Sequence, residues 1–162
     1  MFKELKEFLI SKNEDISLLN VDYIRESFNK VLYYNESDNE KPLDILSDIY
    51  LNFKDMFKYE GIVYRGIFAP SNILMPFNSS EIFSFTNNLR VADNFALRGD
   101  YGCGYIVTQD IKDGLNFAEL LITLLDKEIL LEEDVEHFIN EDEVLCPIKN
   151  KYDIKLKYNL LS

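Results

Sequence analysis

The sequence predicts one α+β domain in which helices come first and strands follow. Apolar residues recur at helical spacing up to about residue 58, whereas from Gly61 onward they approach a spacing of two, which is typical of strands. Helices and strands that are segregated along a chain favour antiparallel pairing of the strands. The chain of 162 residues also fits one domain better than two, because domains cluster near roughly 100–150 residues. We therefore expect residues 1–162 to form a single domain.

Three helices are predicted in the first part of the chain. The first two have one apolar face each, formed by Phe2, Leu5, Phe8 and Leu9 and by Ile24, Phe28, Val31 and Leu32. A polar break at residues 35–42 follows, and Pro42 suits the first turn of a new helix. That third helix has the apolar stripe Leu46, Ile49, Tyr50, Phe53 and Phe57.

The remaining residues predict five strands and further helices. The strands are expected at 62–68, 82–86, 105–108, 143–148 and 152–158, the last with Tyr152, Ile154, Leu156 and Tyr158 on one face. Helices are expected at 87–97 and at 117–125, and a short acidic helix or turn at 132–138. Residues 69–80 hold prolines and several Ser and Asn residues, and they predict a loop.

Composition and charge disfavour several classes of function. Acidic residues outnumber basic ones by 29 to 17, and the formal charge of −12 makes nucleic acid an unlikely partner and favours a basic one. The two cysteines, Cys103 and Cys146, have no Cys/His cluster around them, so no metal site is expected. The sequence shows no secretory leader and no apolar run that could cross a membrane, which predicts a cytoplasmic protein.

Two predicted strands carry polar residues in unusual places. Arg65 shares a strand face with Val63 and Ile67, although arginine is rarely buried without a partner. By itself it would be interpreted as an arginine at a strand edge that makes an ion pair. Ser84 and Thr86 share one strand face while phenylalanines occupy the other, so their hydroxyls can face a cleft. The ordinary interpretation is a half-buried strand.

Two glutamates lie close together before the fourth predicted strand. On a strand, Glu141 and Glu143 point the same way and Asp142 points the other way. Two neighbouring carboxylates repel each other, and this raises the pKa of at least one of them. Such an arrangement is tolerated more readily at functional sites, although an acidic segment exposed to solvent is the ordinary interpretation.

An arginine on a first strand, Ser-x-Thr on a second and Glu-x-Glu on a third, in this order, resemble the R-S-E class of mono-ADP-ribosyltransferases. The resemblance covers about residues 61–158 and rests on the segments Tyr64-Arg65-Gly66, Ser84-Phe85-Thr86, Phe95-Ala96-Leu97-Arg98 and Glu141 to Pro147. The third segment leads into a glycine-rich turn, residues 98–105, which corresponds to the family's phosphate–nicotinamide loop.

The sequence also departs from this family in places. Phe85 stands where the family has Thr, and the segment from Ser84 to Phe95 is longer than in the clostridial members. The leucine-rich helix within residues 108–140 is absent from the smallest toxins of the family. The related class with a His-Tyr-Glu set is disfavoured, because the single histidine, His137, lies far downstream of the first strand.

The resemblance implies a fold and a reaction. The fold is N-terminal helices (1–58) followed by a mixed, mainly antiparallel two-sheet core (61–158) that binds NAD. The reaction cleaves the nicotinamide–ribose bond of NAD and transfers ADP-ribose to a nucleophile, with no metal.

The resemblance also implies a role for each site residue. Glu143 is the catalytic residue that holds the ribose, Ser84 orients it, and Thr86 supports the same cleft. Arg65 binds the diphosphate and Gly66 lies against the nicotinamide carboxamide. Phe95 stacks on nicotinamide and Arg98 reaches a phosphate, with packing in the helix core as the alternative for Phe95.

The acceptor implied by the resemblance is an arginine of a basic target protein. Glu141 addresses the guanidinium, and Phe138 recognises the target or, alternatively, pins its loop. Between Asp126 and Glu143 there are nine acidic residues and one basic residue, which suits a basic target, although an exposed acidic helix face is the alternative. Two other functions remain open: an acidic protein that blocks a basic partner, and a transferase whose acceptor is nucleic acid, a small molecule or water.

Overall fold

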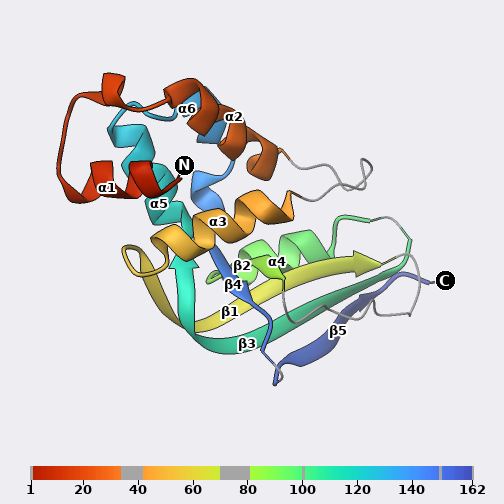
Figure 1. The fold of residues 1–162 in the computed structure, drawn as a ribbon. Coiled ribbons are helices and arrows are strands. Elements are labelled where there is room, and N and C mark those ends of the chain that lie inside the picture. The colour runs from red at the N-terminus through yellow and green to blue at the C-terminus, as the bar shows by residue number, and fades with distance from the viewer. Residues whose placement is uncertain (1, 34–41, 70–80, 100, 150, 162) are drawn as a thin grey trace.

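The fold was analysed in a computed structural model of the chain (Figure 1), which describes residues 2–33, 42–69, 81–99, 101–149 and 151–161. It combines a group of helices with one antiparallel sheet, as the α+β prediction requires. The polar break predicted at 35–42 and the loop predicted at 69–80 lie almost entirely outside the described residues. No helix in the described parts of the chain is long and apolar enough to cross a membrane.

The predicted helices are confirmed, except that the third ends at Phe53 and does not include Phe57. The first part of the chain forms α1 (Phe2–Ile10), α2 (Val21–Leu32) and α3 (Leu43–Phe53), and the second forms α4 (Leu89–Ala96), α5 (Phe117–Asp126) and the short α6 (Glu132–Val135). Asparagines begin three of them: the side chains of Asn20, Asn88 and Asn116 accept hydrogen bonds from backbone N–H groups in the first turns of α2, α4 and α5. Such caps satisfy donors that have no partner inside a helix.

The five strands form a single sheet, in which all the described pairs are antiparallel. They are β1 (Lys58–Ala69), β2 (Ile82–Thr86), β3 (Cys103–Asn116), β4 (Glu143–Pro147) and β5 (Asp153–Asn159), in the order β1-β2-β4-β3-β5, with β1 also paired to β3. The prediction of two separate, mixed sheets is therefore wrong. β3 is long enough to pair with β1 and β5 and still reach β4 at its far end, so hydrogen bonds join the two groups of strands.

The third strand is much longer than the predicted segment 105–108. β3 pairs with β1 almost throughout, from Cys103 opposite Ala69 to Leu115 opposite Lys58. The second half of β3 contains polar residues that interrupt the alternation of apolar and polar residues. One of them, Gln109, is buried, where its amide donates to the carbonyl of Pro147 and accepts from the N–H of Lys149. A polar side chain whose hydrogen-bonding groups all have partners can be buried within a strand. The strand then lacks the apolar pattern by which it would be predicted from the sequence.

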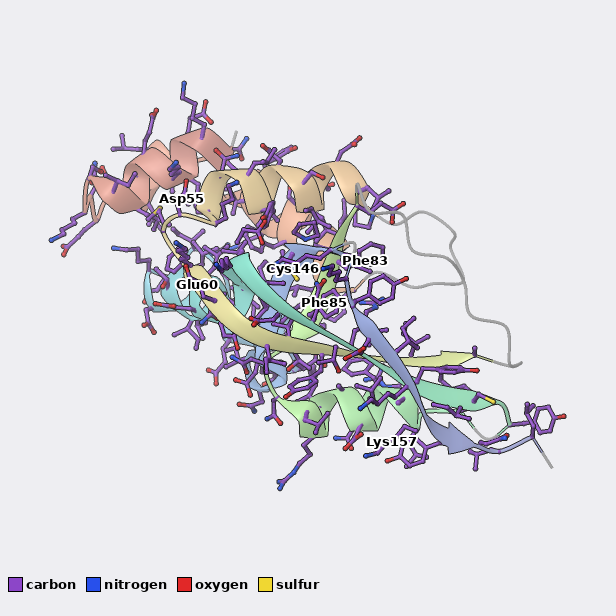
Figure 2. All side chains as sticks on the ribbon, turned by 90° about the horizontal axis from the view of Figure 1, so that it is seen from below. Asp55, Glu60, Phe83, Phe85, Cys146 and Lys157 are labelled. Carbon is purple, nitrogen blue, oxygen red and sulfur yellow. The ribbon has the colours of Figure 1, made fainter. Side chains whose placement is uncertain are left out.

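The face predicted for the last strand is also wrong in part. Gly104 pairs with Tyr158 and the next residue, Tyr105, pairs with Leu156, so a β-bulge leaves one extra residue on β5. Because a bulge shifts the alternation by one residue, Ile154 and Tyr158 lie against different core clusters. Lys157, near this bulge, lies beside α4 (Figure 2), with its Nζ 3.8 Å from Asp93.

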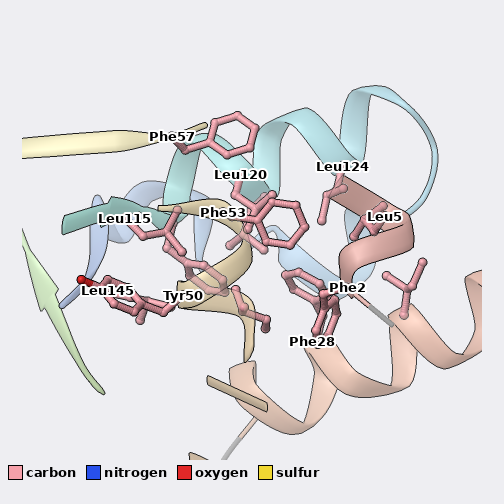
Figure 3. Packing of buried hydrophobic residues seen from close by; sticks show 14 of the residues in the cluster. Phe2, Leu5, Phe28, Tyr50, Phe53, Phe57, Leu115, Leu120, Leu124 and Leu145 are labelled. Carbon is pink, nitrogen blue, oxygen red and sulfur yellow. The ribbon is translucent and has the colours of Figure 1, made fainter. Parts of the chain in front are cut away.

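The main hydrophobic core lies between the helices and one side of the sheet. Figure 3 shows how aromatic and leucine side chains from α1, α2, α3 and α5 meet Leu115 and Leu145 from the strands. A second core lies inside the folded sheet, where Phe83, Phe85 and Cys146 (Figure 2) pack with Val63 and Val107. β4 therefore contributes to both cores, and its two faces are buried.

Candidate active site

A pocket of about 670 Å³ opens where β1 and β2 separate. The two strands share one pair of bridge partners, Tyr64 and Thr86, so the edge of β1 beyond Tyr64 is not covered by β2. Residues of α2, β1, β2, α4 and the segment before β4 line the pocket. All nine residues singled out from the sequence are among them: Arg65, Gly66, Ser84, Thr86, Phe95, Arg98, Phe138, Glu141 and Glu143.

Ser84 and Glu143 are joined by a short hydrogen bond. Ser84 pairs with Leu145 and Thr86 pairs with Glu143, so Ser84 and Glu143 are diagonal neighbours on one face of the β2–β4 pair. The Ser84 hydroxyl donates to Oε1 of Glu143 at 2.5 Å. Burial of Glu143, opposed by this hydrogen bond, raises the pKa of its carboxyl to about 7. Glu141 raises this pKa further and Arg65 lowers it.

Arg65 connects β1 to β2 inside the pocket. Its Nη1 donates to the carbonyl oxygen of Ser84 at 2.6 Å, and its guanidinium lies 5.6 Å from the ring centroid of Phe83. Phe83 belongs to the second core with Val63, and Ile67 packs against this core, so Arg65 shares their strand face, as predicted. A cation is therefore fixed beside the serine that bonds Glu143.

Glu141 does not lie on a strand, so the prediction that it shares a strand face with Glu143 is wrong. It ends a short 3-10 helix, η3 (Ile139–Glu141), and Asp142 then adopts a left-handed conformation with φ 48° and ψ 45° before β4 begins. Both glutamates nevertheless line the pocket, because this turn brings Glu141 alongside the strand end. Burial raises the pKa of Glu141, while the charge of Arg98 opposes the shift.

Thr86 supports the glutamate turn. Its side chain is buried, and its hydroxyl donates to the carbonyl oxygen of Glu141 at 2.7 Å while accepting from the N–H of Asn88. The sequence suggested a hydroxyl facing a cleft. The structure shows a hydroxyl that ties β2 to the residue before Asp142.

Phe95 and Arg98 form another wall of the pocket. Both come from α4 and the residues just after it, and the guanidinium carbon of Arg98 lies 3.7 Å from the ring centroid of Phe95. Phe95 is half-buried and belongs to none of the core clusters in the described part of the chain. A flat aromatic face and a positive charge therefore stand next to each other at the pocket wall.

Close packing against α4 requires glycine at position 66, which the sequence did not predict. A Cβ placed on Gly66 would lie 1.9 Å from the carbonyl oxygen of Ala92 and 2.7 Å from the nitrogen of Ala96. Gly104 on β3 faces the same helix, and its Cβ would lie 2.1 Å from the carbonyl oxygen of Ala96. The two glycines thus let α4, which carries Phe95, rest directly on the sheet.

The apolar residues that line the pocket were also missed. Val31 and Leu32, at the end of α2, lie opposite the strands, and the sequence assigned them only to a helix core. Phe138 lines the pocket and also packs edge-on against Tyr33, at 5.2 Å between ring centroids. Apolar spacing alone could not distinguish a pocket wall from a core.

The described residues hold no group of His, Cys, Asp and Glu side chains that could bind a metal ion. Both cysteines are buried and neither forms a disulfide in the described part of the chain, and burial raises the pKa of Cys146 to about 12. The thiol of Cys146 is therefore a poor nucleophile. The carboxylates that line the pocket are those of Glu141 and Glu143.

Comparisons with known proteins identify no relative. No family model matches this sequence, and neither the curated proteins nor the solved structures contain a significantly similar chain.

Proposed function

We propose that this protein is a mono-ADP-ribosyltransferase that transfers ADP-ribose from NAD to an arginine of a basic protein. The observation that carries this proposal is the half-buried Ser84–Glu143 hydrogen bond in a pocket that Arg65 and Glu141 also line. Arg65, Ser84 and Glu143 come from three strands that are far apart in the sequence, and Glu141 comes from the turn just before β4. Their meeting in one pocket supports the resemblance to the R-S-E class.

The pocket offers complementary groups for NAD. Its two guanidinium groups, on Arg65 and Arg98, can each engage phosphate oxygens of the diphosphate. The ring of Phe95 offers a surface on which the nicotinamide ring can stack. Binding through these groups places the ribose between Arg65 and the carboxylates.

The first chemical step breaks the bond between the ribose C1′ and the nicotinamide nitrogen. The electron pair of this bond leaves with nicotinamide, which becomes neutral, and positive charge develops on the ribose. A fixed carboxylate stabilises such an oxocarbenium-like state, as in glycoside hydrolysis. Glu143 has this role because Ser84 holds its carboxylate in one orientation at the pocket wall.

The second step joins the ribose to the acceptor. A guanidinium nitrogen of the target arginine forms a bond with C1′ and loses a proton, and Glu141 accepts that proton. A carboxylate binds a guanidinium well, and the raised pKa of Glu141 makes it a better base than an exposed glutamate. The products are nicotinamide and an ADP-ribosylated arginine.

The surface next to Glu141 suits a basic target. Glu132, Glu133 and Glu136 are exposed on and after α6, a few residues before Glu141. Clustered negative charge attracts positively charged partners over the range of the Debye length, roughly 8–10 Å at physiological salt. A target that presents arginine among other basic residues is therefore favoured over nucleic acid.

The proposed activity is tested by incubating the full chain with NAD and agmatine, whose guanidinium matches that of arginine. The measured products are free nicotinamide and ADP-ribosyl-agmatine, separated by chromatography and identified by mass. We expect both products from the wild type. Glu143→Gln should lower both by roughly 10²–10³-fold, as does loss of one preorganised electrostatic group.

A second variant separates the two glutamates, and a second acceptor tests the specificity. Glu141→Gln should lower transfer to agmatine much more than hydrolysis of NAD, because water needs no carboxylate that binds guanidinium. A linear diamine of similar length should accept no ADP-ribose. Equal losses of transfer and hydrolysis in Glu141→Gln would show that both carboxylates act on NAD. Undiminished nicotinamide release by Glu143→Gln would rule out the proposed mechanism.

A further inference from the structure

Asp142 occupies an unusual position between the two glutamates. Its backbone is in the left-handed region, which non-glycine residues adopt rarely and Asn and Asp adopt most readily. Three hydrogen bonds hold this turn from the β2 side. The N–H of Asn87 donates to the carbonyl oxygen of Asp142 at 3.1 Å, and the amide of Asn88 donates to its carboxylate at 3.2 Å. The third is the bond from Thr86 to Glu141.

Asn88 connects this turn to the opposite wall of the pocket. Its Oδ1 accepts from the N–H of Arg90 at 3.1 Å and so caps α4, while its Nδ2 donates to Asp142. α4 leads to Phe95 and Arg98, and Asp142 lies between the two glutamates. One side chain therefore ties the aromatic and cationic wall to the acidic one, although neither Asn88 nor Asp142 lines the pocket itself.

We propose that Asn88 and Asp142 are a positioning pair that fixes the Glu141 carboxylate relative to Glu143 and to the Phe95–Arg98 wall. In the reaction, this pair decides whether ADP-ribose passes to arginine or to water, an inference that rests on the proposed transferase function. Glu143 is held independently by the pairing of β4 with β2 and by Ser84. Glu141 precedes the left-handed residue, so a change of backbone angles at Asp142 moves Glu141 and leaves Glu143 in place.

Four substitutions separate the backbone from the side chain. Asp142→Ala removes the hydrogen-bond acceptor and disfavours the left-handed conformation, whereas Asp142→Gly removes the acceptor and still permits that conformation. Asp142→Asn loses the same charge as both of them, but it tolerates the left-handed conformation and keeps an acceptor. Asn88→Ser keeps a side chain that can cap α4 and removes the amide donor.

The first measurement is the ratio of agmatine modification to NAD hydrolysis. We expect Asp142→Ala and Asn88→Ser to lower transfer by about 10–100-fold, as small displacements of reacting groups do, while hydrolysis changes little. The ratio for Asp142→Gly should lie between that for Asp142→Ala and that for the wild type. Asp142→Asn should restore the ratio, which a loss caused only by charge would not do. Circular dichroism establishes that each variant remains folded.

The second measurement needs no NAD. Carbon-13 NMR of the labelled protein follows the titration of the Glu141 and Glu143 carboxyls. The charge of Glu141 raises the pKa of Glu143 in the native arrangement, so we expect a lower pKa of Glu143 in Asp142→Ala and Asn88→Ser, and the wild-type value in Asp142→Asn.

The two measurements distinguish the two proposals. An unchanged pKa of Glu143 in both Asp142→Ala and Asn88→Ser overturns the positioning pair, as does transfer at the wild-type rate in both. If the wild type releases no nicotinamide at all, the transferase proposal fails, and the NMR titration alone then decides whether the pair positions Glu141.

Discussion

Glu143 combines two opposing requirements in one side chain. In the proposed reaction it must carry a negative charge to stabilise a developing cation, yet its surroundings raise its pKa to about 7. Burial makes a carboxylate electrostatically effective because little water screens it, and the same burial disfavours the charged form. The chemistry of the pocket is therefore expected to depend on pH near neutrality.

The pH dependence of the reaction is the first prediction at this scale. We expect kcat/KM for nicotinamide release to rise as the pH increases through about 7, because only ionised Glu143 is active. The positive nicotinamide ring of bound NAD lowers the pKa of the neighbouring carboxyl, so the midpoint for kcat should lie at lower pH. Steady-state rates from about pH 5 to pH 9 test this. A flat profile over that range would contradict the assigned role of Glu143.

The stability of Glu143→Gln is the second prediction. Between the ordinary glutamate value of 4.5 and about 7, the folded protein binds a proton at Glu143 that the unfolded chain has released. The contribution of Glu143 to the free energy of unfolding is thus fully present below pH 4.5 and is lost as the pH rises through about 7. Glutamine carries no charge at any pH. We therefore expect Glu143→Gln to unfold at a higher temperature than the wild type at alkaline pH, with the difference shrinking in acid.

Thermal unfolding followed by circular dichroism at several pH values measures this difference. Glu133→Gln is the matched control, since Glu133 is an exposed glutamate outside the pocket. It should leave the unfolding temperature almost unchanged at every pH. If the unfolding temperatures of Glu143→Gln and the wild type differed by the same amount at every pH, the difference would come from hydrogen bonding and not from charge.

At the scale of elements, the position of α4 depends on the absence of two side chains. Gly66 and Gly104 lie on neighbouring strands, and each leaves space for a backbone carbonyl of α4. Ala92 and Ala96, the small residues that face them, are fully buried. Small residues on both sides bring a helix and a sheet unusually close, so the pocket wall formed by Phe95 is set by backbone contact.

Adding one methyl group at this contact is the third prediction. Gly66→Ala places a Cβ 1.9 Å from the carbonyl oxygen of Ala92, so α4 must shift or the strand must move. Overpacking of this kind typically costs about 1–3 kcal/mol of the free energy of unfolding. We expect that loss in urea denaturation, together with weaker binding of NAD in calorimetry, because Phe95 and Arg98 move with the helix.

Ile62→Ala provides the comparison on the same strand. Ile62 is 50% exposed, and exposed positions usually change stability by within about 0.5 kcal/mol. It should leave NAD binding unchanged. If Gly66→Ala binds NAD as the wild type does and loses no stability, α4 is not held by this contact.

At the scale of the whole molecule, the helical part and the sheet share one core. Leu115 and Leu145 from the strands pack within the helical cluster (Figure 3). Polar contacts cross the same boundary: the hydroxyl of Tyr50 donates to the carbonyl of Asp113 at 2.6 Å, and the N–H of Asn116 donates to the carbonyl of Phe57 at 2.7 Å. Neither part can be removed without exposing the core of the other.

Cooperative unfolding of the whole chain is the fourth prediction. We expect a single transition in urea, with coincident curves for helix content and for tyrosine fluorescence, because both parts lose the shared core together. A chain limited to residues 61–162 should lack a cooperative transition. Two separate transitions in the full chain, or a stable sheet without the helices, would show that the prediction of a single domain is wrong.

The sequence alone determined the elements whose pattern repeats along the chain. The helices α1, α2, α3 and α5 follow from apolar stripes over several turns, and β2 and β4 follow from short runs of apolar residues between breaks. The order of Arg65, Ser84 and Glu143 along three strands was also visible in the sequence. Such signals are local, since each depends on residues within a few positions of one another.

The tertiary structure decided what depends on distant partners. The length of β3 and the bulge in β5 follow from pairing with other strands, so no local pattern reports them. The same holds for the single sheet and for the pocket walls formed by Val31 and Leu32. Glu141 reaches the pocket through the left-handed turn at Asp142, which Asn87 and Asn88 hold from more than fifty residues away. Register, bulges and turns of this kind minimise the free energy of the whole fold, and the local sequence only makes them possible.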